Sequence, residues 1–295
     1  MTARINTTVL MSGVDYFDDG QAINPFMDAS VAIDLAAAAS EHTRIKQALE
    51  SAGVTVHQVQ PPTDCQDGVY TANWALVRGD TAVMSRLPNA RQAEEAYAAA
   101  TLERLGKHLV YVPDGLRFSG QGDALPCGNY LFCGSQYRSD IAAQTFVADT
   151  LGYERIQLQT IPQLDDSGQP VINPCSGWAD SFYYDIDLAL SVLRAPDGDQ
   201  KGLIAWCPAA FTLESQEALR QFDKVDKIEV SEAEATQAFA CNLVSTGETV
   251  VMNGGATEFA RALESHGLQV IGLSNPELGK GGGSIRCTTL TLNNQ

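Results

Sequence analysis

The sequence has few basic residues and no long apolar segment. Lysine and arginine number 19 against 36 aspartate and glutamate residues, which gives a formal net charge of −17 in a chain of 295 residues. Such an acidic surface repels nucleic acid and anionic membranes, so neither is an expected partner. No run approaches the roughly 18 apolar residues of a membrane span, and the N-terminal residues lack the apolar stretch of a signal peptide. We therefore expect a cytoplasmic protein. Its acidic surface would favour a small cationic ligand, but acidic surfaces more often serve only to keep a protein in solution.

Cysteine and histidine lack the spacing that metal sites or disulfide frameworks require. The seven cysteines are scattered and include no CxxC pair, and there are only four histidines. Asp185 and Asp187 alternate and could share a face as ligands for a hard metal, but no third ligand is near them in sequence. Most of the cysteines are therefore interpreted as buried, small apolar side chains, and no metal or other cofactor is expected.

A helix followed by a short strand recurs five times along the chain. The repeats read IKQALESAGVTVHQV, AATLERLGKHLVYV, FVADTLGYERIQLQTI, EALRQFDKVDKIEV and FARALESHGLQVIGL. In each, apolar residues at helical spacing give way to a period-two run. Gly53, Gly106, Gly152 and Gly267 stand at four of these boundaries, as expected for left-handed helix caps.

Hairpins precede these repeats. Turns are predicted at Gly79-Asp80, Gly128-Asn129 and Thr246-Gly247, and LALSVLRAPDGDQKGLIAW reads as a hairpin with a longer loop. The repeating unit is thus strand, strand, helix, strand. We predict a single α/β domain over residues 1–295 whose units close into a ring around one central mouth.

Six segments resemble, in order, the motifs of the pentein superfamily of guanidine-modifying enzymes. They are AINPFMD, VYTANWALV, RFSGQGDAL, YRSD, YYDIDLAL and GGGSIRCTTL. The resemblance implies a five-fold pseudosymmetric α/β propeller built from ββαβ units. It is strongest toward dimethylarginine dimethylaminohydrolases, arginine dihydrolases and amidinotransferases, and it implies an arginine-like cationic substrate and a possible homodimer.

Cys287 in GGGSIRCTTL matches the nucleophile of that superfamily. A guanidinium carbon resists water, but a thiolate can attack it when carboxylates hold the NH groups and an acid protonates the departing amine. Glycines 281–283 would let the backbone approach a ligand. From spacing alone, Cys287 could equally be an inert residue of a C-terminal strand.

Two of the residues that the superfamily normally uses are replaced here. YYDIDLAL aligns on a His-x-Asp pattern and places Asp187 on the acidic position but Asp185 where histidine stands; a shift of one residue would place Tyr184 there. RFSGQGD offers Ser119 where relatives carry glutamate. Asn73 agrees with the dihydrolase-like members.

The carboxylates are expected to crowd negative charge around Cys287. Asp185, Asp187 and Asp123 would raise the pKa of the thiol until a bound cation offsets them, or two of them would share a proton and supply an acid and base near neutrality. The resemblance further implies that Asp185 occupies the acid/base position and that Asp187 and Asn73 hold the cation.

Other side chains have two interpretations each. Arg138 matches an arginine that binds a substrate carboxylate, or it could form a surface ion pair with Asp140. Arg86 and Arg91 are interpreted as solvated charges at a helix start. Asn242 either lines the ring or caps a hairpin.

We therefore expect a cysteine-dependent hydrolase that cleaves a C–N bond of a guanidino substrate through a covalent thiouronium intermediate. Ser119, Asp123, Asn73 and Arg138 are the expected substrate-binding residues. An amidinotransferase is an alternative, and so is a binding protein that kept the pocket without the chemistry.

Overall fold

The structure, a computed structural model, describes residues 4–134 and 137–294, so the ends of the predicted domain lie outside the described residues. Its strands form five three-stranded sheets, each with one antiparallel and one parallel pairing. The sheets are β15 (Leu290–Thr291), β1 (Thr8–Met11) and β2 (Thr55–Gln58); β3 (Ala75–Arg78), β4 (Thr81–Met84) and β5 (His108–Tyr111); β6 (Ala124–Cys127), β7 (Tyr130–Cys133) and β8 (Glu154–Gln157); β9 (Leu190–Arg194), β10 (Gly202–Trp206) and β11 (Val225–Glu229); and β12 (Val244–Ser245), β13 (Thr249–Asn253) and β14 (Gln269–Leu273).

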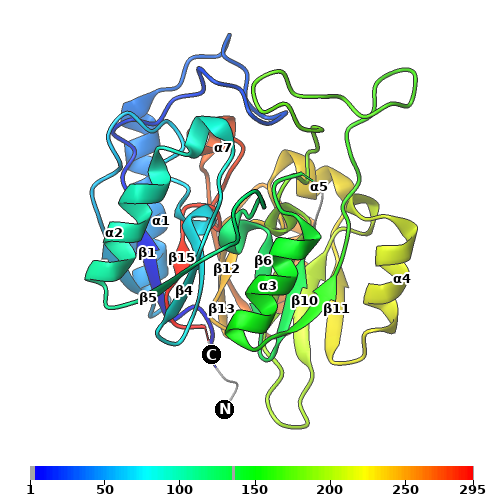
Figure 1. Cartoon of the computed structure of the whole chain (residues 1–295). Coiled ribbons are helices and arrows are strands. Elements are labelled where there is room, and N and C mark those ends of the chain that lie inside the picture. The colour runs from blue at the N-terminus through cyan, green and yellow to red at the C-terminus, as the bar shows by residue number, and fades with distance from the viewer. Residues whose placement is uncertain (1–3, 135–136, 295) are drawn as a thin grey trace.

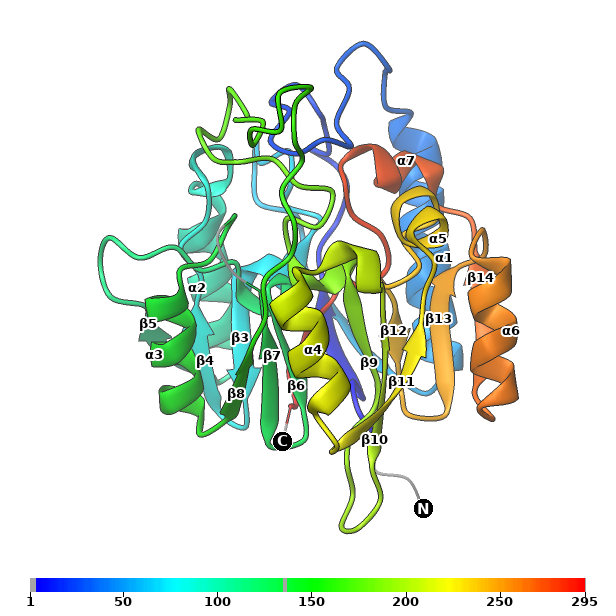
Figure 2. The same ribbon diagram turned by 90° about the vertical axis from the view of Figure 1, so that its right-hand side faces the viewer.

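A helix connects the two parallel strands of each sheet. Figure 1 and Figure 2 show these helices on the outside of the molecule and the strands on the inside. The connecting helices are α1 (Leu35–Ser51), α2 (Glu94–Arg104), α3 (Ile141–Leu151), α4 (Leu213–Gln221) and α6 (Thr257–Ser265), and two short helices, α5 (Glu232–Gln237) and α7 (Pro276–Lys280), lie near the upper loops. The predicted propeller of ββαβ units is confirmed.

The glycines predicted as helix caps adopt the conformation that this role requires. Gly53, Gly106, Gly152 and Gly267 have φ between 69° and 79°, and the predicted hairpin turns connect the expected strands. Left-handed backbone strains residues that carry a Cβ, so glycine lets each helix turn directly into its strand.

The first sheet is closed by the two ends of the described chain. β1 pairs in parallel with β2 and antiparallel with β15, with Val9 opposite Thr291 and Leu10 opposite Leu290. The sequence repeats did not reveal this pairing, because its hairpin is replaced by strands that lie about 280 residues apart. Closing the first unit draws the segment that contains Cys287 to the centre of the ring.

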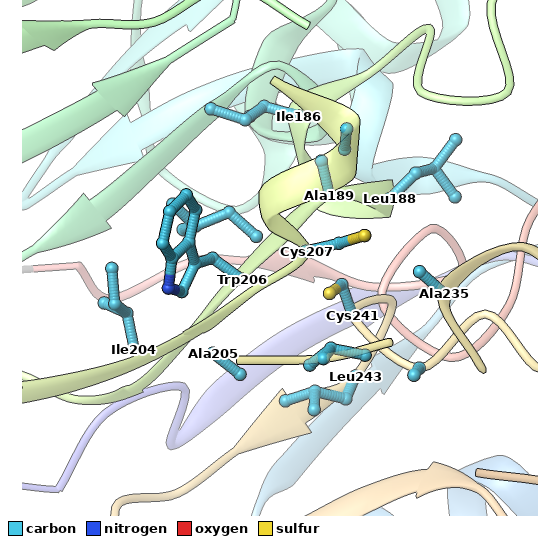
Figure 3. Close-up of a cluster of buried hydrophobic side chains, with 14 of the residues drawn as sticks. Ile186, Leu188, Ala189, Ile204, Ala205, Trp206, Cys207, Ala235, Cys241 and Leu243 are labelled. Atoms are coloured by element: carbon cyan, nitrogen blue, oxygen red, sulfur yellow. The ribbon is translucent and has the colours of Figure 1, made fainter. Parts of the chain in front are cut away.

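Apolar side chains fill the space between strands and helices, whereas the centre of the ring is polar. Figure 3 shows part of the largest cluster, in which Trp206 and Ile204 come from β10, Leu188 comes from the turn before β9, and Cys207 lies near Cys241. Along the ring axis the buried residues are instead polar or charged, among them Asn73, Gln121, Asp123, Asp185, Asp187, Asn242, Arg286 and Thr288. Buried polar groups are stable only where partners satisfy them, so this centre must be a connected network.

Long loops gather at one end of the ring, and the first and last described residues lie at the other. Residues 12–34 and 160–185 rise above the sheets together with α7, whereas both ends of the described chain lie at the lower end (Figure 1). No helix of the described residues is both long and apolar enough to cross a membrane.

Candidate active site

The Cys287 sulfur lies in the polar centre of the ring. The residue is 3% exposed and lies three positions before the first residue of β15, in a turn and not in the strand itself. Asp187 approaches on one side, and the thiol donates to its Oδ2 over 3.5 Å. Cys287 therefore lies before the strand and not in it, and its residue also packs against an apolar cluster that includes Tyr70 and Ile285. Its role as a nucleophile stays a prediction.

Asn242 fixes the turn that carries the sulfur. Its Oδ1 accepts from the backbone N–H of Ser284 at 3.0 Å and of Cys287 at 3.1 Å, and its Nδ2 donates to the Cys287 sulfur at 3.1 Å. One amide thus satisfies two backbone donors and supplies a donor to the sulfur, which stabilises the thiolate form. Asn242 lines the ring and is a positioning residue that the sequence indicated only as one of two possibilities.

Close packing around the sulfur explains one of the glycines before it. A Cβ built on Gly283 would lie 2.8 Å from Cys287 Cβ and 2.5 Å from the Tyr70 ring. Real Cβ atoms essentially never approach other atoms below about 3.0 Å, so a larger residue than glycine would force Cys287 or Tyr70 to shift. The Tyr70 hydroxyl donates to the Leu278 carbonyl at 2.6 Å and ties the turn to α7.

Asp185 lies in a separate group of partners beside Asp187. Its Oδ2 accepts from Asn73 Nδ2 at 2.7 Å and lies 3.8 Å from Arg138 Nη1. The same Asn73 Nδ2 donates to Ser119 Oγ at 2.9 Å. The structure thus brings Asn73, Ser119, Arg138 and Asp185 together, as the sequence predicted.

Arg138 points into the ring and does not pair with Asp140. Its guanidinium lies 3.9 Å from the centre of the Tyr184 ring, a cation–π arrangement, and Asp140 instead pairs with Arg117 at 2.7 Å. The surface-pair interpretation is therefore wrong. The Tyr184 hydroxyl donates to the Gly282 carbonyl at 2.6 Å, which anchors the glycine turn from the opposite side.

Arg91 was interpreted as a solvated charge, and that interpretation is wrong. It is 2% exposed, pairs with Glu94 at 2.7 Å and donates to Asn73 Oδ1 at 2.6 Å. Arg91 therefore fixes the orientation of the Asn73 amide, whose other end contacts Asp185. The sequence signal was available in Arg91 and Glu94, because residues three apart meet on a helical turn.

Asp123 forms hydrogen bonds that hold the backbone next to the site. Its Oδ1 accepts from the Ile186 backbone N–H at 3.2 Å, and its Oδ2 accepts from Gln144 at 3.2 Å. These bonds fix the backbone between Asp185 and Asp187. Asp123 is therefore placed as a positioning residue, and its predicted contact with substrate stays a prediction.

Charge crowding controls protonation in the site. Burial, followed by Asp187 and Asp185, raises the pKa of the Cys287 thiol well above its ordinary value. Burial and the Asp185 charge likewise raise the pKa values of Asp187 and Asp123 well above the usual range for carboxyl groups. The crowded carboxyl groups therefore disfavour the Cys287 thiolate in the absence of a bound cation.

The four histidines lie away from these groups. His42 is in α1, His57 in β2, His108 in β5, and His266 ends α6. Burial lowers the pKa of His42 to about 4, so it is neutral at physiological pH. Within the described ranges, no group of three histidine, cysteine or acidic residues has an arrangement that could hold a metal ion.

A propeller with a buried cysteine at its acidic centre is typical of the guanidine-modifying enzymes. The comparisons with known proteins agree with this assignment. The N-terminal domain of ArgZ, an arginine dihydrolase from cyanobacteria, superposes with a TM-score of 0.83 and 27% identity over 97% of this chain and 98% of that domain. A dimethylarginine dimethylaminohydrolase adduct superposes with a TM-score of 0.71 at 16% identity over 98% and 99% of the two chains, which shows a shared fold.

Sequence similarity identifies the family. The chain is 31% identical over 280 residues to a dimethylarginine dimethylaminohydrolase of Mycobacterium tuberculosis, covering 94% of this chain and 83% of that protein. It is 30% identical to the bifunctional arginine dihydrolase/ornithine cyclodeaminase AgrE of Nostoc, covering 99% of this chain but 38% of that longer protein. No protein-family model matches. The chain belongs to the family of dimethylarginine dimethylaminohydrolases and arginine dihydrolases within the pentein superfamily.

Proposed function

We propose that the protein is a cysteine-dependent hydrolase that cleaves a C–N bond of an arginine-like guanidino substrate. The observation that carries the proposal is the position of the Cys287 sulfur, held between the Asn242 amide at 3.1 Å and the Asp187 carboxyl at 3.5 Å in the buried centre of the ring. The relatives named above are hydrolases of arginine or dimethylarginine, and a structure of ArgZ contains a covalently bound reaction intermediate.

Substrate binding supplies the charge that the empty site lacks. A planar guanidinium entering beside Asp185 and Asp187 offsets their negative charge and favours ionisation of the neighbouring carboxyl and thiol groups. The enzyme is therefore activated by its own substrate. Arg138, near the upper loops, would bind a substrate carboxylate and in doing so would draw away from Asp185.

The reaction proceeds in two balanced steps. In the first step, the Cys287 sulfur bonds to the guanidinium carbon, and the thiol proton passes through a carboxyl group to the departing nitrogen. The bond between that nitrogen and the carbon breaks, so that an amine is released and a thiouronium cation remains on the sulfur. In the second, water attacks that carbon, the carbon–sulfur bond breaks, the thiol regains a proton, and a ureido product forms. The proton released from water converts the amine to its ammonium form.

Distances favour Asp187 as the group that carries the proton. Its Oδ2 lies 3.5 Å from the sulfur, whereas Asp185 Oδ2 is occupied by Asn73 and lies near Arg138. We therefore assign the acid/base role to Asp187 and the holding of the cation to Asp185 with Asn73, which reverses the roles implied by the sequence resemblance. In either assignment a carboxyl group replaces the missing histidine.

Turnover of a substrate panel tests the proposal. The wild type would be incubated with arginine, methylated arginines, agmatine and guanidino acids, and the ureido product and the released amine would both be quantified. We expect the two products in equal amounts. The Cys287→Ser variant is the matched control and should release neither product. Transfer of the amidino group to an added amine, with no ureido product, would instead identify an amidinotransferase.

A binding protein is the second candidate, and one observation favours it. The ion pair between Arg138 and Asp185 already neutralises part of the site. Saturable binding of a guanidino compound by calorimetry, with no turnover of any panel member, would establish this candidate in place of the hydrolase.

A further inference from the structure

A small polar cavity lies beside Asp187, on the side of the ring where the two ends of the described chain meet. Its volume is about 20 Å³, and Asn6, Asp187, Ser191 and Arg286 are among the residues that line it. A polar cavity of this size can hold one water molecule, provided that two or more polar groups surround it. Asp187 belongs both to this cavity and to the candidate active site, because its Oδ2 accepts from the Cys287 thiol at 3.5 Å.

Arg286 is a buried cation whose position beside this cavity is fixed by the fold. Its side chain is 6% exposed, and its Nη1 donates to Thr291 Oγ1 at 3.0 Å and to Asn6 Oδ1 at 3.5 Å. Burial lowers the pKa of Arg286 to about 10, so the guanidinium keeps its charge at neutral pH. Asn6 precedes β1 and Thr291 ends β15, so the pairing that closes the first sheet also places this charge next to the site.

Asp187 is the acidic residue that lines the same cavity, but the two side chains are not in direct contact. Among the described residues, Arg286 has no carboxylate within the 4.0 Å of an ion pair. Asp187 Oδ1 is buried and has no hydrogen-bond partner within the described ranges, and the same holds for Ser191 Oγ. Buried polar atoms are normally satisfied by protein or by ordered water, so one occupant of the cavity is expected to contact both.

We propose that Arg286 is a positioning residue for Asp187 and that one water molecule in the cavity joins the two side chains. The water accepts from the guanidinium and donates to Asp187 Oδ1, and the Ser191 hydroxyl is its third partner. Held at Oδ1, the carboxyl group keeps its Oδ2 turned toward the Cys287 sulfur. The inference rests on the proposed function, because the orientation of Asp187 matters for the proton transfer assigned to it above.

Opposite charges on one small cavity favour a neutral occupant. A metal cation would meet the Arg286 guanidinium and an anion would meet the Asp187 carboxyl group, so each would be repelled by one side of the cavity. A water molecule both donates and accepts hydrogen bonds, so it can contact the two groups at once. The cavity thus carries a water-bridged pair between Arg286 and Asp187.

A crystal structure of the wild type at a resolution that shows ordered water tests the bridge. We expect one water within hydrogen-bond distance of Asp187 Oδ1, Ser191 Oγ and the Arg286 guanidinium. The water density should weaken in Ser191→Ala, and the Asp187 carboxyl group should turn away from the sulfur in Arg286→Met. The control is Ser12→Ala, which removes a buried unpartnered hydroxyl outside the cavity and should change neither.

Two outcomes of this experiment would overturn the proposal. One is a wild-type cavity with no water density, and the other is an unchanged Asp187 carboxyl group in Arg286→Met. If Arg286→Met does not fold, the wild type and Ser191→Ala still decide whether the bridge exists.

Urea unfolding tests in solution whether the charge of Arg286 acts on Asp187. Loss of that charge makes ionisation of Asp187 in the folded protein less favourable, and a higher folded pKa means that more stability is lost as the pH rises. The midpoint of urea unfolding of Arg286→Met, relative to the wild type, should therefore fall further at pH 8 than at pH 5. Arg286→Lys keeps the charge and should avoid most of the additional loss. The control is Arg261→Gln, which replaces an exposed arginine.

The same measurements in Asp187→Asn separate this effect from that of the neighbouring groups. The other titratable groups around Asp187 are Asp123, Asp185 and Cys287. In Asp187→Asn the additional loss that Arg286→Met causes at pH 8 should disappear. An equal additional loss in both backgrounds, or none in either, would show that Arg286 does not act through Asp187. None of these measurements requires turnover, so the inference and the proposed hydrolase activity can fail separately.

Discussion

In the absence of a bound cation, the environment of Cys287 disfavours ionisation of its thiol. Burial and two carboxyl groups raise the pKa of the thiol, while the Asn242 amide partly opposes them. Because an adjacent negative charge disfavours a second one, removal of the Asp187 charge should lower the thiol pKa.

Alkylation rates measure this effect. Near pH 8, iodoacetamide should modify Cys287 faster in Asp187→Asn than in the wild type. The rate should rise about tenfold for each unit by which the pKa of the thiol falls. Peptide mass mapping separates Cys287 from Cys175, an exposed free cysteine that serves as the internal control. Equal rates at Cys287 in both proteins would show that access, and not charge, limits its reactivity.

Asn242 provides a second prediction at this scale. Asn242→Ala leaves the backbone donors of Ser284 and Cys287 without their acceptor, so the free energy of unfolding should fall by about 1–3 kcal/mol. Asn242→Asp retains an acceptor for both donors but places a charge beside the sulfur, so it should be more stable than the alanine variant and slower in alkylation. Urea unfolding and the same alkylation assay distinguish the two effects. If both variants unfold like the wild type, the amide does not position the turn.

Sequence reasoning at the residue scale succeeded where a family motif carried it and failed where burial decided. Cys287 contacts Asp187, and Asp185 contacts Asn73, so the residues that the motifs indicated lie in one buried centre. The interpretation of Arg91 as solvated fails because the fold buries it: the spacing of Arg91 and Glu94 indicates their pair, but only tertiary packing brings Asn73 to the same guanidinium.

Among the secondary-structure elements, β15 is short but closes the ring. Leu290 lies opposite Leu10, is fully buried, and belongs with Trp74 to one apolar cluster. Its backbone pairing and side-chain packing both join the end of the chain to β1, so the first sheet depends on it.

Truncation of that side chain should therefore loosen the site as well as the fold. Leu290→Ala should reduce the free energy of unfolding by about 2–5 kcal/mol through lost burial and a residual cavity. Leu213→Ala is the control, because Leu213 is 83% exposed and should change stability by less than about 0.5 kcal/mol. Denaturant unfolding of both variants gives the comparison, and equal losses would argue against β15 as the closing element.

The elements themselves were predictable, but the closure was not. Helical spacing, period-two runs and glycine caps are local signals, and all five helix-strand units follow from them. The pairing of β1 with β15 joins residues at opposite ends of the chain and leaves no local signal.

At the scale of the whole molecule, the free energy of unfolding should fall as the pH rises, because a buried carboxyl group must then ionise in the folded state. Burial raises the pKa of Asp67 to about 6 from an ordinary value near 3.8. A carboxyl group whose folded pKa is raised stabilises the folded state below its unfolded pKa, and this contribution is lost as the pH rises through about 6.

The variant Asp67→Asn isolates that contribution. The free energy of unfolding of Asp67→Asn minus that of the wild type should increase by about 3 kcal/mol from pH 4 to pH 8. A shift of about two pKa units corresponds to that amount. Urea unfolding at the two pH values measures the difference. A difference that does not change with pH would mean that Asp67 titrates normally in the folded protein.

Intact mass spectrometry during turnover tests the central claim most directly. The claim is that the Cys287 sulfur bonds to the carbon of a guanidino substrate. Rapid acid quenching of the wild type with a turned-over or tightly bound guanidino compound should show an added amidino mass on Cys287, which is absent in Cys287→Ala. Accumulation of ureido product with no adduct at any quench time, or equal turnover by Cys287→Ala, would contradict the account.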